Sequence, residues 1–145
     1  MKIFVAVDEN NGILFNNRRV SKDKALRQRI LDIVGDNTLY ITEFSRKQFK
    51  DEIESGEFKI DIDEDMLFWA DDEDYCFLED VNADGFFDFI SDIYLYRWNR
   101  EYPADTYFSF PDEEYDLVST EDFAGFSHDT ITEEHFVRRQ DEQEV

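Results

Sequence analysis

Cysteine is almost absent from this chain of 145 residues, in which Cys76 stands alone. A lone cysteine excludes an internal disulfide and a cysteine-ligated zinc site within one chain. Five scattered glycines leave no glycine-rich phosphate loop, and two prolines leave no proline-rich linker. No apolar run approaches the length of a membrane span. No signal-peptide cleavage pattern follows the apolar start, so we expect the cytoplasm as the compartment.

Basic residues are also scarce, with 15 Lys and Arg against 37 Asp and Glu and a formal net charge of −22. Residues 1–50 are mildly basic, whereas the stretch 51–92 holds 17 acids and a single lysine, Lys59. Such a surface repels nucleic acid and anionic lipid and attracts cations or basic proteins. An aromatic content of 17% nevertheless predicts a packed core rather than a disordered acidic tail.

The pattern of apolar residues predicts strands that alternate with helices at first and strands that gather near the end. The expected strands are 3–7, 38–42, 58–62, 75–78, 93–98, 107–110 and 115–118. The expected helices are one from Ser21 to Gly35, then 45–53, 64–70, 86–90 and 130–137. This order predicts an α/β fold: a single domain over residues 1–139 with a mixed central β-sheet flanked by helices. Residues 140–145 are expected to form a frayed acidic tail.

The sharpest local motif resembles a calcium-binding loop. Oxygen-bearing side chains stand at its positions 1, 3, 5 and 9: Asp80, Asn82, Asp84 and Asp88. Such alternating ligands can converge on one Ca²⁺ ion, and Gly85 at position 6 permits the sharp turn. The pattern breaks at position 12, where Ser91 replaces the closing glutamate. A polar turn between a strand and a helix explains the same residues, so both interpretations stay open.

Two runs of carboxylates form the second signal. They are Asp61, Asp63, Glu64 and Asp65, then Asp71, Asp72, Glu73 and Asp74. Acid–base catalysis needs a desolvated pair with separated pKa values, whereas acids in polar turns are usually solvated. Closely spaced carboxylates can also imitate the phosphates of DNA. We therefore predict that both runs bind a basic protein surface.

The remaining chemistry-bearing residues favour structural roles. His128 and His135 are seven residues apart, not the four typical of a metal pair on a helix, and are expected to lie at the surface. No Ser-His-Asp order or nucleophile elbow can be argued from the sequence. Six basic residues between Arg18 and Arg29 predict a solvated helix face that offsets the acids of the same fold.

Several segments, in this order, resemble dihydrofolate reductase. Ile3–Ile13 resembles its opening strand and loop, and Asn37–Thr42 resembles its second strand. Ile93–Tyr96, Ala104–Phe108 and Tyr115–Ser119 resemble its late strand and the segment after it. The resemblance spans most of the chain and implies a dihydrofolate reductase-like fold with a central mixed sheet flanked by helices.

The chemistry of that family does not carry over to this sequence. Asp23 is the nearest candidate for the carboxylate that binds the pterin, but it is displaced by about one helical turn. Glu79 and Asp80 stand where the family has a Gly-Gly pair that approaches the NADPH pyrophosphate, so NADPH binding is not expected. The chain also resembles small bacterial proteins labelled ribonuclease Z. The zinc cluster of such nucleases needs more histidines than the two that this chain has.

The leading hypothesis is a non-catalytic, strongly acidic interaction protein that binds a basic protein surface. Its sharper form is a nucleic-acid mimic that inhibits a nucleic-acid-binding enzyme, as anti-CRISPR and anti-restriction proteins do. One alternative is a divergent reductase-like enzyme or small-ligand binder, and another is a calcium-binding module. The sequence predicts no direct contact with nucleic acid or a membrane, and it leaves the partner and the oligomeric state open.

Overall fold

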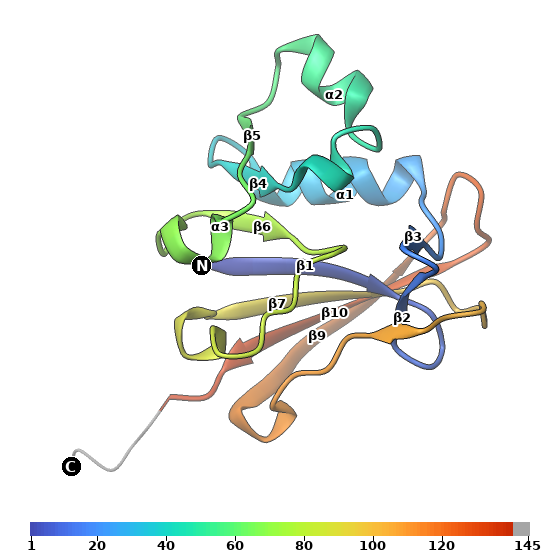
Figure 1. The fold of residues 1–145 in the computed structure, drawn as a ribbon. Coiled ribbons are helices and arrows are strands. Elements are labelled where there is room, and N and C mark those ends of the chain that lie inside the picture. The colour runs from blue at the N-terminus through green and yellow to red at the C-terminus, as the bar shows by residue number, and fades with distance from the viewer. Residues whose placement is uncertain (141–145) are drawn as a thin grey trace.

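A seven-stranded mixed sheet forms the centre of the computed structural model, which describes residues 1–140 (Figure 1). Its strand order is β5-β4-β6-β1-β7-β10-β9. These strands are β1 (Lys2–Val7), β4 (Leu39–Ile41), β5 (Ile60–Ile62), β6 (Tyr75–Phe77), β7 (Asp92–Arg97), β9 (Tyr115–Phe123) and β10 (Ile131–Arg138). The five strands from β5 to β7 run parallel, whereas β10 runs antiparallel to both β7 and β9.

A smaller sheet and short helices complete the fold. The smaller sheet is antiparallel and consists of β3 (Arg18–Arg19), β2 (Gly12–Phe15) and β8 (Thr106–Tyr107). The helices are α1 (Lys24–Val34), α2 (Lys50–Ser55) and α3 (Met66–Trp69). Short 3₁₀ turns lie at Glu43–Ser45, Phe87–Phe89 and Asp112–Glu114. The expected α/β fold with a mixed central sheet is confirmed.

The two faces of the central sheet bury separate apolar cores, because successive side chains of a strand point to opposite faces. On one face, Leu26 of α1 belongs to the same core as Phe4 of β1. On the other face, Met66 of α3 belongs to a core with Ile3 of β1 and Cys76 of β6. Figure 1 shows α1 along one side of the sheet and α3 close to the chain's N-terminus. Burial raises the pKa of the Cys76 thiol to about 12, so this cysteine is an inert core residue.

The predicted strands up to residue 98 agree with β1, β4, β5, β6 and β7 within about two residues at each end. Helix α1 ends as predicted at Gly35, whose φ of 59° suits a residue without a Cβ. The helix begins later than predicted, since its N-cap is Asp23 rather than Ser21. The predicted helix 45–53 is also shorter, because α2 starts only at Lys50.

The predicted final helix at 130–137 is wrong, because these residues form strand β10. The capping-box spacing of Thr130 and Glu133 also fits a strand in which buried Ile131 and Glu133 point to the same face. Pairing with β7 on one side and β9 on the other satisfies the backbone of this strand. Long-range pairing therefore overrides the local helix signal.

Residues 141–145, which make up most of the predicted acidic tail, lie outside the described residues. No helix within residues 1–140 is long and apolar enough to cross a membrane.

The segment 86–90, predicted as a helix, contains a 3₁₀ turn at Phe87–Phe89 instead. Strand β9 continues to Phe123, five residues beyond its predicted end, because it pairs with β10 along most of its length.

Candidate functional site

Side chains of the protein close the carboxyl ends of the parallel strands, where open α/β sheets usually bind ligands. Arg19 donates from Nε and Nη2 to the two carboxylate oxygens of Glu79, at 2.7 and 3.0 Å. Ser45 Oγ and Gln48 Nε2 donate to the same carboxylate, at 2.7 and 3.0 Å. The cavity beside them measures about 10 Å³, which is the space of about one water molecule.

The structure shows side chains that fill this end of the sheet, whereas the sequence indicates only acidic residues there. The sequence suggests repulsion of a pyrophosphate by Glu79 and Asp80. In the structure, Arg19 compensates the buried charge of Glu79, and Asp80 Oδ1 accepts a hydrogen bond from Thr42 Oγ1 at 2.7 Å. Arg19, Ser45 and Gln48 therefore occupy the space beside Glu79, in addition to the charges that the sequence indicates.

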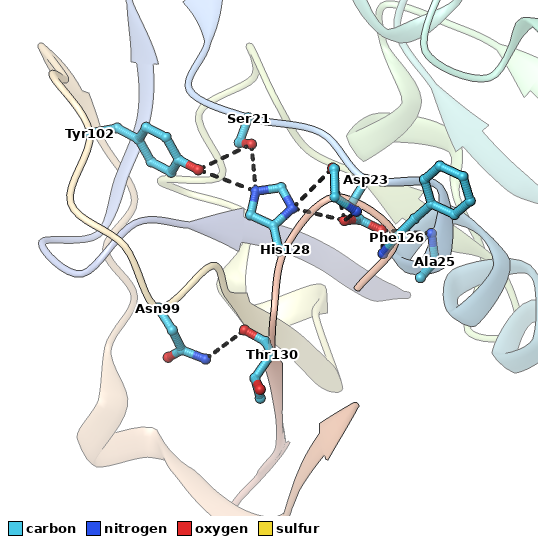
Figure 2. Close-up of polar contacts among 9 residues, drawn as sticks. Ser21, Asp23, Ala25, Asn99, Tyr102, Phe126, His128 and Thr130 are labelled. Atoms are coloured by element: carbon cyan, nitrogen blue, oxygen red, sulfur yellow. Dashed lines mark hydrogen bonds and ion pairs between the residues drawn. The ribbon is translucent and has the colours of Figure 1, made fainter. Parts of the chain in front are cut away.

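His128 meets Ser21 and Asp23, which lie far from it in the sequence, beside the N-terminus of α1 (Figure 2). His128 Nδ1 lies 2.8 Å from Asp23 Oδ2, across a sequence separation of 105 residues. His128 Nε2 lies 2.8 Å from Ser21 Oγ. The prediction of a surface His128 is wrong, because the β9–β10 loop folds over α1 and Trp98 stacks on the imidazole at 4.5 Å. Ser21, His128 and Asp23 therefore contact one another in the order of the nucleophile, the base and the orienting acid of a catalytic triad.

Asp23 is the centre of this cluster and receives five hydrogen bonds. They come from the N–H groups of Ala25, Phe126 and Ser127, from Ser127 Oγ and from His128 Nδ1. The first of these caps α1, and the other four hold the β9–β10 loop. Burial alone would raise the pKa of Asp23, but the bond with His128 and the backbone N–H bonds lower it far below its usual value.

The cluster lacks two features that an acyl-transfer site requires: a base that contacts the nucleophile alone, and space for an acyl group beside the nucleophile. Tyr102 Oη lies 3.2 Å from the same His128 nitrogen and so competes with Ser21. The cavity that Ser21 lines is the one of about 10 Å³, which is too small for an acyl group. We therefore interpret Ser21, Asp23, Tyr102, Ser127 and His128 as a structural unit, here named the Asp23 clasp.

A second buried polar network joins α1 to the central sheet. Glu133 of β10 accepts hydrogen bonds from Nε and Nη2 of Arg29, both at 2.9 Å, and from Tyr96 Oη at 2.8 Å. Arg29 also contacts Glu121. Burial would raise the pKa of Glu133, but the hydrogen bonds from Arg29 and Tyr96 outweigh it and lower the pKa. Of the six basic residues predicted to form a solvated helix face, Arg29 lies on α1 and compensates acids inside this fold, whereas Arg18 and Arg19 lie in strand β3.

The two predicted acid runs lie on neighbouring parts of the sheet. Asp61 is in edge strand β5, and the other acids of its run occupy the turn between β5 and α3. The run 71–74 forms the connection from α3 to β6. Burial raises the pKa of Tyr40, and the charges of Asp74, Asp61 and Asp63 raise it further. Both runs therefore act on one side chain of β4 and contribute to a common negative field.

A groove of about 1290 Å³ lies at the amino ends of the parallel strands, opposite the closed end. Six acids line it: Asp71, Asp72, Glu73, Asp88, Glu113 and Glu114. Phe68, Phe86 and Phe89 line it as well, together with Met1 and Arg138. We name this feature the acidic groove. It brings together three segments that the sequence does not connect: the α3–β6 turn and the two 3₁₀ turns near residues 88 and 113.

Three of the four side chains of the calcium-type motif contact different partners. Asp80 contacts Thr42, whereas Asp88 lies 3.8 Å from Arg138 at the acidic groove. Asn82 Oδ1 accepts the N–H of Asp84 at 2.8 Å, which is the bond of a polar turn. Within residues 1–140, no three His, Cys, Asp or Glu side chains are arranged to hold a metal ion. The geometry favours the turn interpretation of the motif.

These features define an α/β protein of dihydrofolate reductase-like fold whose usual ligand end is closed. The comparison with solved structures agrees on the fold. The chain is similar to the dihydrofolate reductase of Enterococcus faecalis, solved as a complex with NADP(H) and RAB-propyl, with a TM-score of 0.64. The likeness covers 96% of this chain and 97% of that chain at 10% sequence identity, so it shows the fold alone. No protein-family model and no curated protein matches the sequence.

Proposed function

We propose that this protein is a non-catalytic interaction protein whose acidic groove and neighbouring acids bind a basic protein surface. One observation carries the proposal: four groove acids, Asp71, Asp72, Glu73 and Glu113, form no ion pair with any of residues 1–140. Buried acids such as Glu79 and Glu133 are paired with arginines, whereas these four groove acids are exposed. Unpaired charges of one sign raise the local concentration and the association rate of an oppositely charged partner.

The finer proposal is that the partner is a nucleic-acid-binding enzyme, which this protein inhibits in the manner of anti-CRISPR or anti-restriction proteins. Consecutive exposed carboxylates resemble the closely spaced charges of a phosphate backbone, and such enzymes carry a basic surface for that backbone. The closed ligand end supports a role without a cofactor. The proposed compartment is the cytoplasm, where a nucleic-acid enzyme would be encountered.

Inhibition of DNA cleavage tests this function. The protein is added to a panel of purified restriction and Cas nucleases, and at least one is expected to lose activity in a salt-sensitive manner. The groove variant carries Asp71→Asn, Asp72→Asn, Glu73→Gln and Glu113→Gln. The control variant removes the same charge from exposed acids on α1, α2 and nearby turns: Asp32→Asn, Asp36→Asn, Asp51→Asn and Glu57→Gln.

We expect the groove variant to raise the inhibitory concentration by about tenfold or more and the control by less than about threefold. Equal losses in the two variants would show that net charge alone acts and would contradict a role for the groove. A panel in which no nuclease is inhibited would contradict the proposed enzyme partner.

The small-ligand alternative is tested by NADPH fluorescence. Because Arg19 and Trp98 fill the ligand end of the sheet, the addition of this protein is expected to leave the emission of NADPH unchanged. A titration that saturates at low micromolar protein would instead support the reductase-like alternative, and Arg19→Ala would then be expected to tighten the binding.

A further inference from the structure

Exposed phenylalanine side chains lie in the acidic groove, among the acids. Phe68 is 69% exposed and Phe89 is 67% exposed, while the rings of Phe68 and Phe86 meet edge to face at 4.9 Å. Trp69, beside Phe68 in α3, is 68% exposed. Large apolar side chains gathered in a concave, otherwise charged surface mark an interaction site more than isolated exposed ones do. Charge alone does not account for these rings.

The positive charges near the groove are already engaged within the fold. Arg138 Nη1 donates to Glu114 at 3.0 Å, and Arg139 Nη2 donates to Asp116 at 2.9 Å. The N-terminal ammonium of Met1 donates to the carbonyl oxygen of Phe89 at 2.9 Å. Lys2 Nζ donates to the carbonyl oxygen of Asp72 at 3.0 Å, and the carboxylates of the α3–β6 turn and of Glu113 belong to no ion pair among residues 1–140. The groove therefore offers apolar faces among six carboxylates, which outnumber the three cations that line it: the N-terminal ammonium, Arg138 and Arg139.

This combination selects one kind of occupant. A nucleic acid is repelled by the carboxylates. A second copy of this chain would be repelled as well, because it carries a net charge of −22 of its own. A partner segment that had charged but no apolar side chains would leave the rings of Phe68 and Phe89 exposed. Arginine suits both parts of the groove, because its guanidinium pairs with carboxylates and stacks on aromatic rings. An adjacent apolar side chain of the partner would cover the remaining ring surface.

We propose that the acidic groove binds a basic segment of a partner protein, in which arginines alternate with large apolar side chains that pack on Phe68 and Phe89. This inference rests on the proposed function and specifies its partner. Apolar contact makes part of the affinity insensitive to salt, whereas a mimic that acts only by charge loses its partner as salt rises.

Two synthetic peptides of equal length and equal positive charge serve as probes. One contains Arg with Leu and Phe, and in the other Gly and Ser replace the apolar residues. Binding to the full chain is measured by fluorescence anisotropy at about 50 mM and about 300 mM salt. The variant Phe68→Ala/Phe89→Ala removes the groove rings, and Phe126→Ala, at an exposed site in the β9–β10 loop, is the matched control. A thermal melt confirms that each variant folds.

We expect the apolar peptide to bind at least about tenfold more tightly than the charge-only peptide, most clearly at high salt. The double variant should remove this difference, and Phe126→Ala should leave it unchanged. If both peptides bind equally to the wild type, or the double variant changes neither, the inference is overturned while the proposed basic partner stands. If neither peptide binds even at low salt, both the inference and the proposed function fail.

Discussion

Asp23→Ala is expected to lower the free energy of unfolding by about 3–5 kcal/mol, a large share of the roughly 5–15 kcal/mol typical of a domain. The substitution removes the N-cap of α1, a loss of about 1 kcal/mol. It also leaves the N–H groups of Phe126 and Ser127 and the buried imidazole of His128 without their acceptor. Each buried polar group left unpaired costs about 1–3 kcal/mol.

Urea unfolding followed by circular dichroism measures this loss. Asp32→Ala, at an exposed position of the same helix, is the matched control and should change stability by less than about 0.5 kcal/mol. Asp23→Asn, which keeps a capping oxygen but not the charge, should fall between the two. A loss below about 1 kcal/mol for Asp23→Ala would show that water replaces the clasp without penalty.

The same carboxylate gives the protein a defined response to acid. Because the folded-state pKa of Asp23 is below its ordinary value of 3.8, its contribution is complete above that value and is lost as the pH falls further. The lowered pKa values of Asp92 and Glu133 act in the same direction. The difference between the wild type and Asp23→Asn between about pH 6 and pH 3 isolates the clasp, and it should shrink as the pH falls.

The sequence predicts the parallel half of the sheet well, because each of these strands carries its own signal. Residues 3–7 are a continuous apolar run bounded by a polar turn, and that pattern admits few structures other than a buried strand. The predicted helix at 130–137 fails for the opposite reason. Its local pattern is compatible with helix or strand, and partners more than thirty residues away in β7 decide between them.

The clasp and the closed ligand end depend on pairings that no local pattern reveals. In the sequence, Asp23 is a candidate for the carboxylate that binds the pterin and His128 is expected at the surface, and only the fold brings them together. Glu79 looks like a free carboxylate until Arg19, 60 residues earlier, is placed against it. For the groove, the acid run is visible in the sequence, but its aromatic surface is not. In the four apolar residues of α3, only the structure shows that Met66 is buried and Phe68 is exposed.

Glu133→Ala is expected to be the second most damaging substitution, with a loss of about 2–4 kcal/mol. The larger part comes from Tyr96, which is fully buried and whose hydroxyl group would lose its hydrogen-bond acceptor. Arg29 contributes less, because its side chain is 28% exposed and Glu121 also contacts it. Glu121→Ala is the matched control, since this 62% exposed carboxylate should be worth less than about 1 kcal/mol.

A double-mutant cycle separates the contributions of the two partners of Glu133. If the unpaired hydroxyl group of Tyr96 causes most of the damage, then Tyr96→Phe should destabilise the wild type but restore about 1–2 kcal/mol in the Glu133→Ala background. If instead the lost ion pair with Arg29 dominates, Tyr96→Phe will be neutral or harmful in both backgrounds. The sign of the effect of Tyr96→Phe in the variant therefore decides whether Glu133 stabilises the sheet mainly as a hydrogen-bond acceptor or as a counter-charge for α1.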